Sequence, residues 1–380
     1  MIKVLEVISD TNVGGAGVLL VSRLRHSDRK RFHTVVLLPA KSQLIARFRR
    51  IGIETVEMKG CQDRSADMGS VWEIMGIIRR VRPDLINCHG CLCARIAATL
   101  CRVPVRVYTR HCTYPLSKFQ KSPPVRLFYG TFAALLSHRA LAVATAVKHD
   151  LLEMGVPSHR ISVVINGAEA LKKTDEAELR RWREELGIRD GQTVVGINAR
   201  LEACKDHACF LRAAERLHRR SNRYFFLIVG DGSLRKELEA EAERRGLRAR
   251  VAFVGFVEDV SPFVNLMDIH VNCSVGTETS SLAISEAMSV GVPTIASDYG
   301  GNPYMVRDGE NGFLFPKGND KALAACIEKL SSSPALYARL SQNAKNRFEH
   351  ELNAESMTKK TERLYARLYQ KYARNGESKV

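Results

Sequence analysis

Short apolar runs rich in β-branched residues alternate with amphipathic segments along most of this 380-residue chain. In the first half, the runs that predict strands are IKVLEVIS, HTVVLLP, DLINCHG, VRVYTRH, RALAVA and RISVVING. Helical patterns, such as Val71 to Val81, lie between them. A helix between two strands returns the chain to the same end of the sheet, so the strands pair in parallel. The first half therefore predicts a parallel sheet with helices on both faces.

The same rhythm pauses near NGAEALKKTDEAELRRW and then restarts with TVVGINA, RYFFLIVG, RVAFVGF, DIHVNCS and VPTIAS. Two such series predict an α/β protein with two Rossmann-like domains that face a central cleft, and the chain is long enough for both. We expect the first domain to span residues 1–165 and the second residues 166–350. The charged helical pattern near the end is too long for one compact helix. We expect residues 351–380 to cross back and pack on the first domain.

The positive charge is concentrated in the first half. Residues 1–165 hold 25 Lys and Arg against 11 Asp and Glu, whereas the remaining residues hold 33 against 30. A basic half suits nucleic acid, an acidic membrane surface or a phosphorylated substrate, although it can also be a solvated surface without a specific partner. No run approaches the roughly 20 apolar residues that span a bilayer, and Glu6 interrupts the apolar N-terminus. The sequence therefore predicts a cytoplasmic protein, and its ten cysteines, which follow no disulfide-scaffold spacing, are expected to be reduced.

Glycine-rich turns follow three of the predicted strands, in TNVGGAG, VGDGS and SDYGGNP. In open α/β sheets, ligands bind beyond the carboxyl ends of the strands, where glycines let phosphates approach helix N-termini. Each turn taken alone is also compatible with close packing and no ligand. The first turn lacks the G-x-G-x-x-G order of a dinucleotide fingerprint, so a nicotinamide cofactor is disfavoured.

The stretch ETSSLAISEAMSVGVPT places Glu278 and Glu286 with seven residues between them. We expect residues 275–279 to form a loop and Ser280 or Ser281 to cap the helix that follows. Glu278 would then lie at the carboxyl end of a strand, and Glu286 about a turn and a half into the helix. Free N–H groups of the first helical turn stabilise an anion, and the carboxylates accept hydrogen bonds from hydroxyls. This pattern suits a nucleotide sugar; the alternative is a loop charge and a solvent-facing helix residue.

Two basic residues follow the first strand of the second half, in GINARLEACKD. The guanidinium of Arg200 and the ammonium of Lys205 could together neutralise a diphosphate, including the charge that develops as it leaves. Without the other motifs, both would be interpreted as surface charges.

Taken together, these motifs resemble those of the retaining glycosyltransferases of family 4, which have the GT-B architecture. The segments RLEACK, GDG and VGFVEDV, and the Glu-x7-Glu element that continues through EAMSVGVPTIAS to GG, agree with that family from Ile161 to Phe315. The first half agrees through GGAG, HG and the histidine of YTRH. The resemblance implies transfer of a hexose or N-acetylhexosamine, with retention, from a nucleotide sugar that is expected to be UDP-linked. The acceptor would be a lipid-linked sugar or a polysaccharide in cell-surface glycan synthesis.

The resemblance also implies roles for residues of the second half. Arg200 and Lys205 would hold the donor diphosphate, Glu278 would contact the transferred sugar, and Glu286 would accept hydrogen bonds from the ribose hydroxyls. The other implied donor-binding positions are Gly230, Gly255, Phe256, Ser280, Ser281 and Leu282, of which Gly255 and Phe256 would border the base.

In the first half, the resemblance implies that Gly15 lets the backbone approach a phosphate or the acceptor, and that His111 lies near the reacting sugar. Three departures leave the donor preference open: Thr279-Ser280-Ser281 stands where many relatives have Gly-Phe-Gly, Tyr304 replaces an acid, and Gly17 stands where an acid is common.

We expect neither a cofactor nor a metal ion. No Asp-x-Asp pair marks a metal-bound diphosphate, and Arg200 with Lys205 would supply the neutralising charge. The segment CHGCLC brings three cysteines and a histidine close together, which permits a zinc interpretation. Without a second ligand pair at zinc-finger spacing, buried thiols are the favoured interpretation.

The segment PLSKFQKSPPVRLFYGTFAALL interleaves Lys118, Lys121 and Arg126 with aromatic residues, a composition that suits an acidic membrane interface. A core-facing helix with a basic edge would look the same. We therefore predict an enzyme peripheral to the inner face of the cytoplasmic membrane, with no nucleic-acid partner. Two alternatives remain open: a nucleotide-sugar epimerase or hydrolase of the same architecture, and a non-catalytic binder of anions or nucleic acid.

Overall fold

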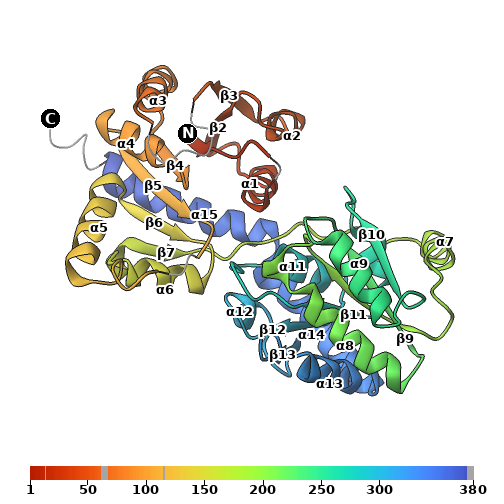
Figure 1. The fold of residues 1–380 in the computed structure, drawn as a ribbon. Helices are drawn as coiled ribbons and strands as arrows, with labels where there is room; N and C mark the ends of the chain where they lie inside the picture. Colours follow the sequence, from red (N-terminus) through yellow and green to blue (C-terminus); the bar gives the residue numbers. More distant parts are fainter. Residues whose placement is uncertain (13, 61–66, 114–115, 375–380) are drawn as a thin grey trace. The chain divides into compact units, whose positions relative to one another are not determined.

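The computed structural model describes residues 1–12, 14–60, 67–113 and 116–374, which form two compact units (Figure 1). Unit 1 contains Met1–Gly167 and the chain from Ala354 onward, and unit 2 contains Ala168–Asn353. The chain therefore enters unit 2 after Gly167 and returns to unit 1 after Asn353, where the sequence places these limits at 165 and 350.

A parallel sheet forms the centre of unit 1. Its strands are β1 (Ile2–Ile8), β2 (Phe32–Pro39), β3 (Glu54–Met58), β4 (Leu85–His89), β5 (Val105–Arg110), β6 (Arg139–Ala142) and β7 (Ile161–Val163). Among the described residues, their order is β3-β2-β1-β4-β5-β6-β7. The central strand β1 pairs with β2 through Leu5 and Val35, and with β4 through Leu5 and Ile86. The sequence does not predict β3, because its residues, ETVEM, include two glutamates and form no continuous apolar run. In the structure both glutamates are exposed and only Met58 is buried.

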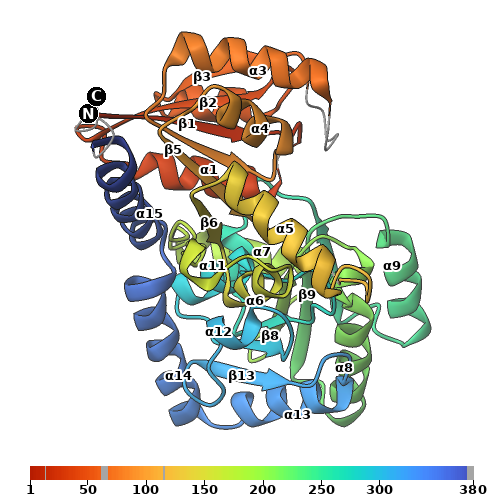
Figure 2. The same cartoon turned by 90° about the vertical axis from the view of Figure 1, so that its left-hand side faces the viewer.

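Helices cover both faces of this sheet. They are α1 (Gly15–Arg25), α2 (Leu44–Arg50), α3 (Met68–Val81), α4 (Leu92–Leu100), α5 (Pro123–Leu136), α6 (Thr145–Glu153) and α15 (Ala354–Tyr369), with short turns η1 (Ser158–Arg160) and η4 (Gln370–Arg374). The carboxylate of Asp67 caps α3 by accepting from the N–H groups of Gly69 and Ser70. The last helix, α15, lies beside α1, where the Thr358 hydroxyl donates to the carbonyl of Arg23 at 3.0 Å (Figures 1 and 2).

A second parallel sheet forms the centre of unit 2. Its strands are β8 (Thr193–Asn198), β9 (Tyr224–Val229), β10 (Val251–Gly255), β11 (Ile269–Asn272), β12 (Thr294–Ser297) and β13 (Gly312–Phe315), in the order β10-β9-β8-β11-β12-β13 within the described chain. Every residue of β9 is buried, as expected for a parallel strand that is covered on both faces. The final strand, GFLF, has only four residues, and the sequence does not predict it.

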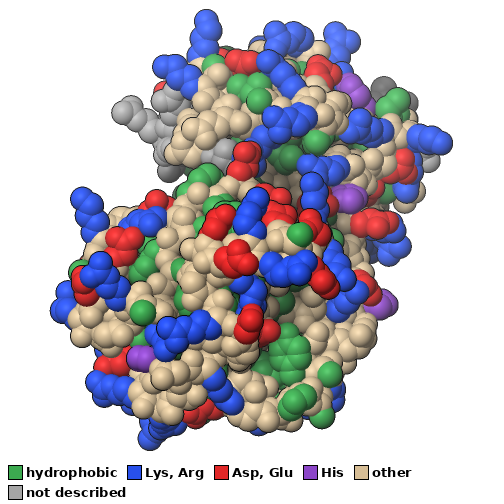
Figure 3. Space-filling model, turned by 90° about the vertical axis from the view of Figure 1, so that its right-hand side faces the viewer, with side chains coloured by type: hydrophobic (Ala, Val, Ile, Leu, Met, Phe, Trp, Pro, Cys, Tyr) green, Lys and Arg blue, Asp and Glu red, His purple; other side chains and the backbone are tan. Residues whose placement is uncertain are grey.

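The helices of unit 2 carry interleaved charges. They are α7 (Glu176–Leu186), α8 (His207–Arg220), α9 (Arg235–Arg244), α10 (Ser261–Leu266), α11 (Leu282–Ser289), α12 (Asn302–Met305), α13 (Asp320–Ser331) and α14 (Pro334–Arg347), with turns η2 (Ala203–Lys205) and η3 (Phe348–Leu352). Arg245 pairs with Glu241 at 2.7 Å, and Arg235 with Glu239 at 2.8 Å. Figure 3 shows acidic and basic side chains interspersed in this way. The long helical pattern near the C-terminus is interrupted by the π-helical turn η3 and by extended Asn353.

Candidate active site

The strand order reverses once in each unit, between β1 and β4 and between β8 and β11. Ligands of open α/β sheets bind at the carboxyl ends of the strands beside such a reversal. In unit 2 these ends are Asn198 of β8 and Asn272 of β11. The loops that follow them carry Lys205 and Glu278, so the fold places both predicted residues at the position where a ligand is expected.

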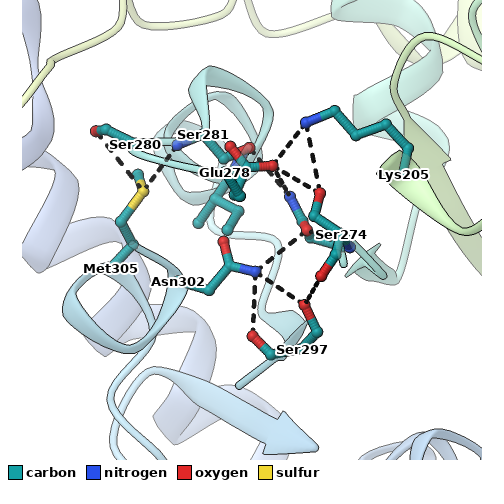
Figure 4. Close-up of polar contacts among 10 residues, drawn as sticks. Lys205, Ser274, Glu278, Ser280, Ser281, Ser297, Asn302 and Met305 are labelled. Carbon is teal, nitrogen blue, oxygen red and sulfur yellow. Dashed lines mark hydrogen bonds and ion pairs between the residues drawn. The ribbon is translucent and has the colours of Figure 1, made fainter. Parts of the chain in front are cut away.

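Glu278 is the centre of a buried polar cluster (Figure 4). Its Oε2 accepts from the ammonium of Lys205 at 2.7 Å, from the hydroxyl of Ser274 at 2.7 Å and from the amide of Asn272 at 3.4 Å. The side chain of Glu278 is 6% exposed and that of Lys205 is 21% exposed. A carboxylate this deeply buried requires a paired cation, so Lys205 and Glu278 fix each other in one geometry.

The loop that carries Glu278 continues into α11 through two buried serines. The hydroxyl of Ser281 caps α11, where it accepts from the N–H of Ile284, and it also accepts from Asn272 at 3.2 Å. The N–H of Ser281 points to the sulfur of Met305 at 3.1 Å, and the hydroxyl of Ser280 to the same sulfur at 3.9 Å (Figure 4). Both serines are thus held within the fold, and the next residue, half-buried Leu282, begins the helix.

Gly300 and Gly301, the double glycine before α12, lie directly against the loop that carries Glu278. The N–H of Gly301 donates to the carbonyl of Glu278 at 3.2 Å. A Cβ at Gly301 would lie 1.5 Å from the carbonyl oxygen of Thr279, and a Cβ at Gly300, where φ is +60°, would lie 2.1 Å from that of Glu278. Only glycine permits this approach, because both neighbouring atoms belong to the backbone. The turn therefore sets the position of the Glu278 loop.

Glu286 lies in α11 but outside the Glu278 cluster. Its carboxylate accepts from the amide of Asn198, at the end of β8, at 3.1 Å. Burial raises the pKa of Glu286, and the hydrogen bond from Asn198 opposes that rise.

Tyr304 stands after Gly300 and Gly301, at the position where many relatives have an acid. Its hydroxyl donates to Glu351 at 3.4 Å, and the guanidinium of Arg347 lies 5.2 Å from the centre of its ring.

The remaining predicted positions of unit 2 border the same edge of the sheet. Gly230 has φ +133° and donates to the carbonyl of Gly255 at 2.8 Å, which joins the ends of β9 and β10. Phe256 follows with 78% of its surface exposed. Arg200 is exposed in the loop after β8, and no hydrogen bond or ion pair among the described residues joins its side chain to Glu278. The structure therefore gathers Lys205 with Glu278 and leaves Arg200 apart.

In unit 1, the turn after β1 begins α1 at Gly15, where a Cβ would meet no atom within 4 Å. Two residues later, a Cβ at Gly17 would lie 2.4 Å from the side chain of Leu44. A side chain at that position requires the buried side chain of Leu44 to move. Gly17 thus allows Leu44 to pack against α1.

Glu6 of β1 lies fully buried in unit 1 and binds four side chains. Its Oε1 accepts from Arg23 of α1 and from the hydroxyl of Tyr365 of α15, the latter at 3.0 Å. Its Oε2 accepts from Asn87 at 2.9 Å and lies 2.8 Å from Nε2 of His89. Burial by itself raises the pKa of Glu6, but the charge of Arg23 and the hydrogen bond of His89 lower it from 4.5 to about 2. Glu6 is therefore ionised at neutral pH.

His89, at the end of β4, contacts His111, which follows β5. Nδ1 of His89 lies 2.7 Å from Nε2 of His111, and the two rings stack with centres 5.1 Å apart. Both rings line a cavity of about 30 Å³ in unit 1. Burial, and then the neighbouring His89, lower the pKa of His111 to about 3, so its ring is neutral at physiological pH.

Sequence reasoning did not identify several polar residues of these two sites. In unit 2 they are Asn272, Ser274 and Asn198, which hold the two predicted glutamates. In unit 1 they are Glu6 and its partners. One signal was available: Glu6 is a lone carboxylate within an otherwise apolar strand, and such a group needs buried partners.

The cysteine segment does not assemble a metal centre within the described chain, where no three His, Cys, Asp or Glu side chains gather as ligands. Cys88, Cys91 and Cys93 are buried thiols, and burial raises the pKa of Cys88 well above its usual range. Both ring nitrogens of His89 already contact Glu6 and His111.

Helix α5 of unit 1 presents apolar side chains to solvent. Leu127, Phe128 and Leu135 are 63% to 74% exposed, and Phe119 just before the helix is 75% exposed. The predicted basic residues border this face: Lys118 and Arg126 are exposed, and Lys121 pairs with Glu153 at 2.9 Å. No helix in the described residues is both long and apolar enough to cross a membrane.

Two family models match consecutive parts of the chain. The model for Glycosyltransferase Family 4 matches residues 13–170, and the model for Glycosyl transferases group 1 matches residues 160–347. The matches meet where the chain passes from unit 1 to unit 2.

Two curated relatives match over most of their length. One is the UDP-Gal:alpha-D-GlcNAc-diphosphoundecaprenol alpha-1,3-galactosyltransferase of Escherichia coli, which is 27% identical over 310 residues, 79% of this chain and 79% of the relative. The other is the 2-deoxystreptamine glucosyltransferase of Streptomyces kanamyceticus, which is 27% identical over 281 residues, 69% of this chain and 72% of the relative.

The crystal structure of Anabaena Alr3699/HepE in complex with UDP and glucose has the same fold. It superposes with a TM-score of 0.81 at 23% sequence identity and covers 96% of this chain and 100% of that one. The fold predicted from the sequence, two Rossmann-like parallel sheets of the GT-B type, is therefore confirmed.

Proposed function

The chain belongs to the glycosyl transferases group 1 and is a retaining family 4 glycosyltransferase, and on this basis we propose that it transfers a hexose or N-acetylhexosamine from a UDP-sugar. The acceptor is a lipid-linked sugar or a polysaccharide, and the product enters a cell-surface glycan. Unit 2 binds the donor and unit 1 the acceptor. The observation that carries this proposal is the buried Lys205–Glu278 pair beside the strand reversal of unit 2.

The chemistry of the pair supports a phosphate next to a sugar. An ammonium has three N–H donors, and those of Lys205 reach Glu278 and Ser274 at 2.7 and 3.4 Å. A third donor then binds an oxygen of the donor diphosphate, while Glu278 accepts from sugar hydroxyls through its other oxygen. Arg200, exposed in the adjacent loop, adds the second positive charge, and Glu286 accepts from the ribose. Gly255 and Phe256 border the base, and Gly230 is a further donor-binding position.

In a retaining transfer, the acceptor attacks the face from which the diphosphate leaves. The barrier falls when the charge that accumulates on the leaving diphosphate is stabilised more strongly in the transition state than in the bound donor. Lys205 suits this role because Glu278 and Ser274 hold its ammonium in place before the charge develops. No protein nucleophile is required, and we expect no metal ion to be required.

The names of two similar proteins support UDP in the donor, and one of them supports a lipid-linked acceptor. The relative in Escherichia coli is named for UDP-Gal and a diphosphoundecaprenol-linked sugar, and the Anabaena structure contains UDP and glucose. The relative in Streptomyces kanamyceticus is named for 2-deoxystreptamine. The exposed apolar face of α5 favours the lipid-linked acceptor for this chain.

Calorimetric titration with UDP, GDP and ADP tests the donor site. We expect UDP to bind most tightly, and Lys205→Ala to weaken UDP binding by about 10-fold to 100-fold, the loss expected for a hydrogen bond to a charged group. Lys321→Ala, at an exposed position of α13, removes the same charge elsewhere in unit 2 and leaves UDP binding unchanged. Equal binding by the Lys205→Ala variant and the wild type would contradict the assigned role.

We also propose that unit 1 binds the acidic inner surface of the cytoplasmic membrane through α5. Phe119, Leu127 and Phe128 insert among the lipids, while Lys118, Lys121 and Arg126 contact the headgroups. Flotation with phosphatidylcholine vesicles, with and without phosphatidylglycerol, measures this binding.

Each basic residue near an anionic surface contributes about 1 kcal/mol, so replacing both Lys118 and Lys121 by alanine should weaken vesicle binding about 30-fold. Lys30→Ala, on another exposed part of unit 1, provides the charge control. Binding that ignores phosphatidylglycerol, or that persists unchanged in the double variant, would refute the membrane proposal without affecting the donor proposal.

A further inference from the structure

Helix α12 contacts the Glu278 cluster at both of its ends (Figure 4). At its first residue, the amide of Asn302 donates to Oδ1 of Asn272 at 3.3 Å. At its last residue, the sulfur of Met305 accepts from the N–H of Ser281 at 3.1 Å. Asn302 and Met305 are both buried. A shift of α12 would therefore move atoms that are in contact with the loop between β11 and α11, which carries the predicted donor-binding residues.

A buried guanidinium holds the end of α12. Nε of Arg347, the last residue of α14, donates to the carbonyl of Met305 at 3.0 Å, and its Nη2 donates to the carbonyl of Tyr304. The last carbonyls of a helix have no partner within it, so these bonds satisfy acceptors that α12 leaves open. The side chain of Arg347 is 6% exposed. Arg347 therefore takes the place that water would take at an exposed helix end.

A charge this deeply buried needs an anionic partner, and Glu351 of η3 provides it. Nη1 of Arg347 donates to the carboxylate of Glu351 at 3.4 Å. Burial lowers the pKa of Arg347, and the charge of Glu351 opposes that effect. Arg307 also pairs with Glu351, at 3.6 Å, but more than half of its side chain is exposed. An ion pair that water screens contributes little, so Arg307 is the weaker partner of Glu351.

Tyr304 joins the two charged residues. Its hydroxyl donates to Glu351 at 3.4 Å, and the guanidinium of Arg347 lies 5.2 Å from the centre of its ring. Burial, and then the charge of Glu351, raise the pKa of Tyr304, so its hydroxyl keeps its proton and donates. Arg347, Tyr304 and Glu351, hereafter the Arg347 cluster, thus form a closed set of contacts at the end of α12.

We propose that the Arg347 cluster positions the donor site: Glu351 keeps the guanidinium of Arg347 in place, the guanidinium holds α12, and α12 sets the position of the loop between β11 and α11. This inference rests on the proposed function, because that loop is the part of unit 2 proposed to bind the donor. All of these contacts lie within unit 2. The three residues act through Met305 and do not themselves bind the donor. A purely stabilising role would instead lower the stability of unit 2 and leave the turnover of the folded enzyme unchanged.

Changing Glu351 to glutamine removes the negative charge and retains the shape of the side chain. The guanidinium of Arg347 then lacks its anionic partner and turns toward water, so the carbonyls at the end of α12 lose their donors. Glu349→Gln is the matched control, because Glu349 is an exposed residue of the same turn. It removes the same charge and should leave α12 in place.

A second substitution should restore the ion pair. In Tyr304→Glu, the carboxylate would lie near the present centre of the tyrosine ring and within reach of Arg347. The double variant with Glu351→Gln and Tyr304→Glu therefore moves the anion from η3 to α12 without changing the net charge. It should recover the position of α12, because the guanidinium again has a buried partner.

The ¹³C-labelled methyl group of Met305 reports the position of α12 directly, and its NMR signal is assigned with Met305→Leu. We expect this signal to move in Glu351→Gln and to stay at its wild-type position in Glu349→Gln. An unmoved signal in Glu351→Gln would overturn the link between the Arg347 cluster and α12. Because loss of the tyrosine ring would itself shift the signal, the double variant is compared by turnover.

Turnover of the UDP-sugar tests the link to the donor site. Corrected for the folded fraction, kcat/KM should fall about 10-fold in Glu351→Gln, the loss expected when one hydrogen bond to the donor is lost. The double variant should recover most of this loss, and Glu349→Gln should retain the wild-type value. Unchanged kcat/KM in Glu351→Gln, or no recovery in the double variant, would overturn the proposal.

Tyr304→Phe covers the case in which Glu351→Gln does not fold. It removes only the hydroxyl that donates to Glu351, so we expect the signal of Met305 to shift and kcat/KM to fall about 3-fold. Wild-type values of both would overturn the proposal. If the wild type itself turned over no nucleotide sugar, the proposed function would fail, and the methionine spectra would still decide whether the Arg347 cluster positions α12.

Discussion

The double-glycine turn provides a sharp test of how the Glu278 loop is positioned. In Gly301→Ala, the added Cβ would lie 1.5 Å from the carbonyl oxygen of Thr279. Because real Cβ contacts are essentially never shorter than 3.0 Å, the two backbone segments must separate by about 1.5 Å. No side-chain rotation can relieve this overlap.

The shift reaches the site because Thr279 directly follows Glu278. Hydrogen bonds of 2.7 Å from Lys205 and Ser274 cannot persist if their acceptor moves by about 1.5 Å. Overpacking of this kind costs about 1–3 kcal/mol of folding free energy, which a two-domain protein can survive. A misplacement of about 1 Å costs roughly 100-fold in rate, so turnover should fall far more than stability does.

Thermal unfolding and UDP-sugar turnover, measured on the same preparation, separate the two effects. Gly318→Ala is the matched control: it has φ +74° and no atom within 4 Å of the added Cβ, so it carries about 1 kcal/mol of backbone strain without a steric overlap. We expect a modest loss of stability in both variants and a loss of turnover only in Gly301→Ala. Wild-type turnover in Gly301→Ala would refute the reasoning that the turn sets the position of Glu278.

Two further predictions concern pH. Because the folded pKa of Glu6 lies near 2, below its usual 4.5, its contribution to stability is complete above pH 4.5 and is lost as the pH falls toward 2. In denaturant unfolding, the free energy of unfolding of the wild type should fall by about 3 kcal/mol over that range, and that of the Glu6→Gln variant should lack this fall. In Asn198→Ala, the pKa of Glu286 should rise further, because the hydrogen bond that opposes the effect of burial is gone. The acid limb of the pH profile of donor KM should then move to higher pH; an unmoved limb would argue against Glu286 as a donor ligand.

Much of the fold could be predicted because parallel strands buried on both faces form continuous apolar runs, as in YFFLIV of β9. The two strands that were missed, β3 and β13, lie at sheet edges and have too few apolar residues to stand out. The cap of α11 at Ser281 could be predicted because serine before an apolar helical pattern has a local cause.

The partners within each site could not be predicted, because they come from distant parts of the sequence. Glu6 contacts residues 81, 83 and 359 positions away, namely Asn87, His89 and Tyr365. The motif spacing that indicates Lys205 and Glu278 carries no information on Asn272 or Ser274, whose roles depend on how β11 ends. Conversely, Arg200 belongs to the same motif as Lys205, yet its side chain lies outside the Glu278 cluster in this structure.

The most direct test of the account is the fate of the donor. Purified protein would be incubated with UDP-, GDP- and ADP-sugars, with and without EDTA, and the released or transferred sugar would be followed by mass spectrometry and its anomeric configuration by NMR. We predict that one UDP-sugar is consumed, that EDTA does not stop the reaction, and that the sugar retains its configuration. Inverted sugar, an isomerised UDP-sugar in place of a transferred one, or a strict requirement for a metal ion would contradict the account.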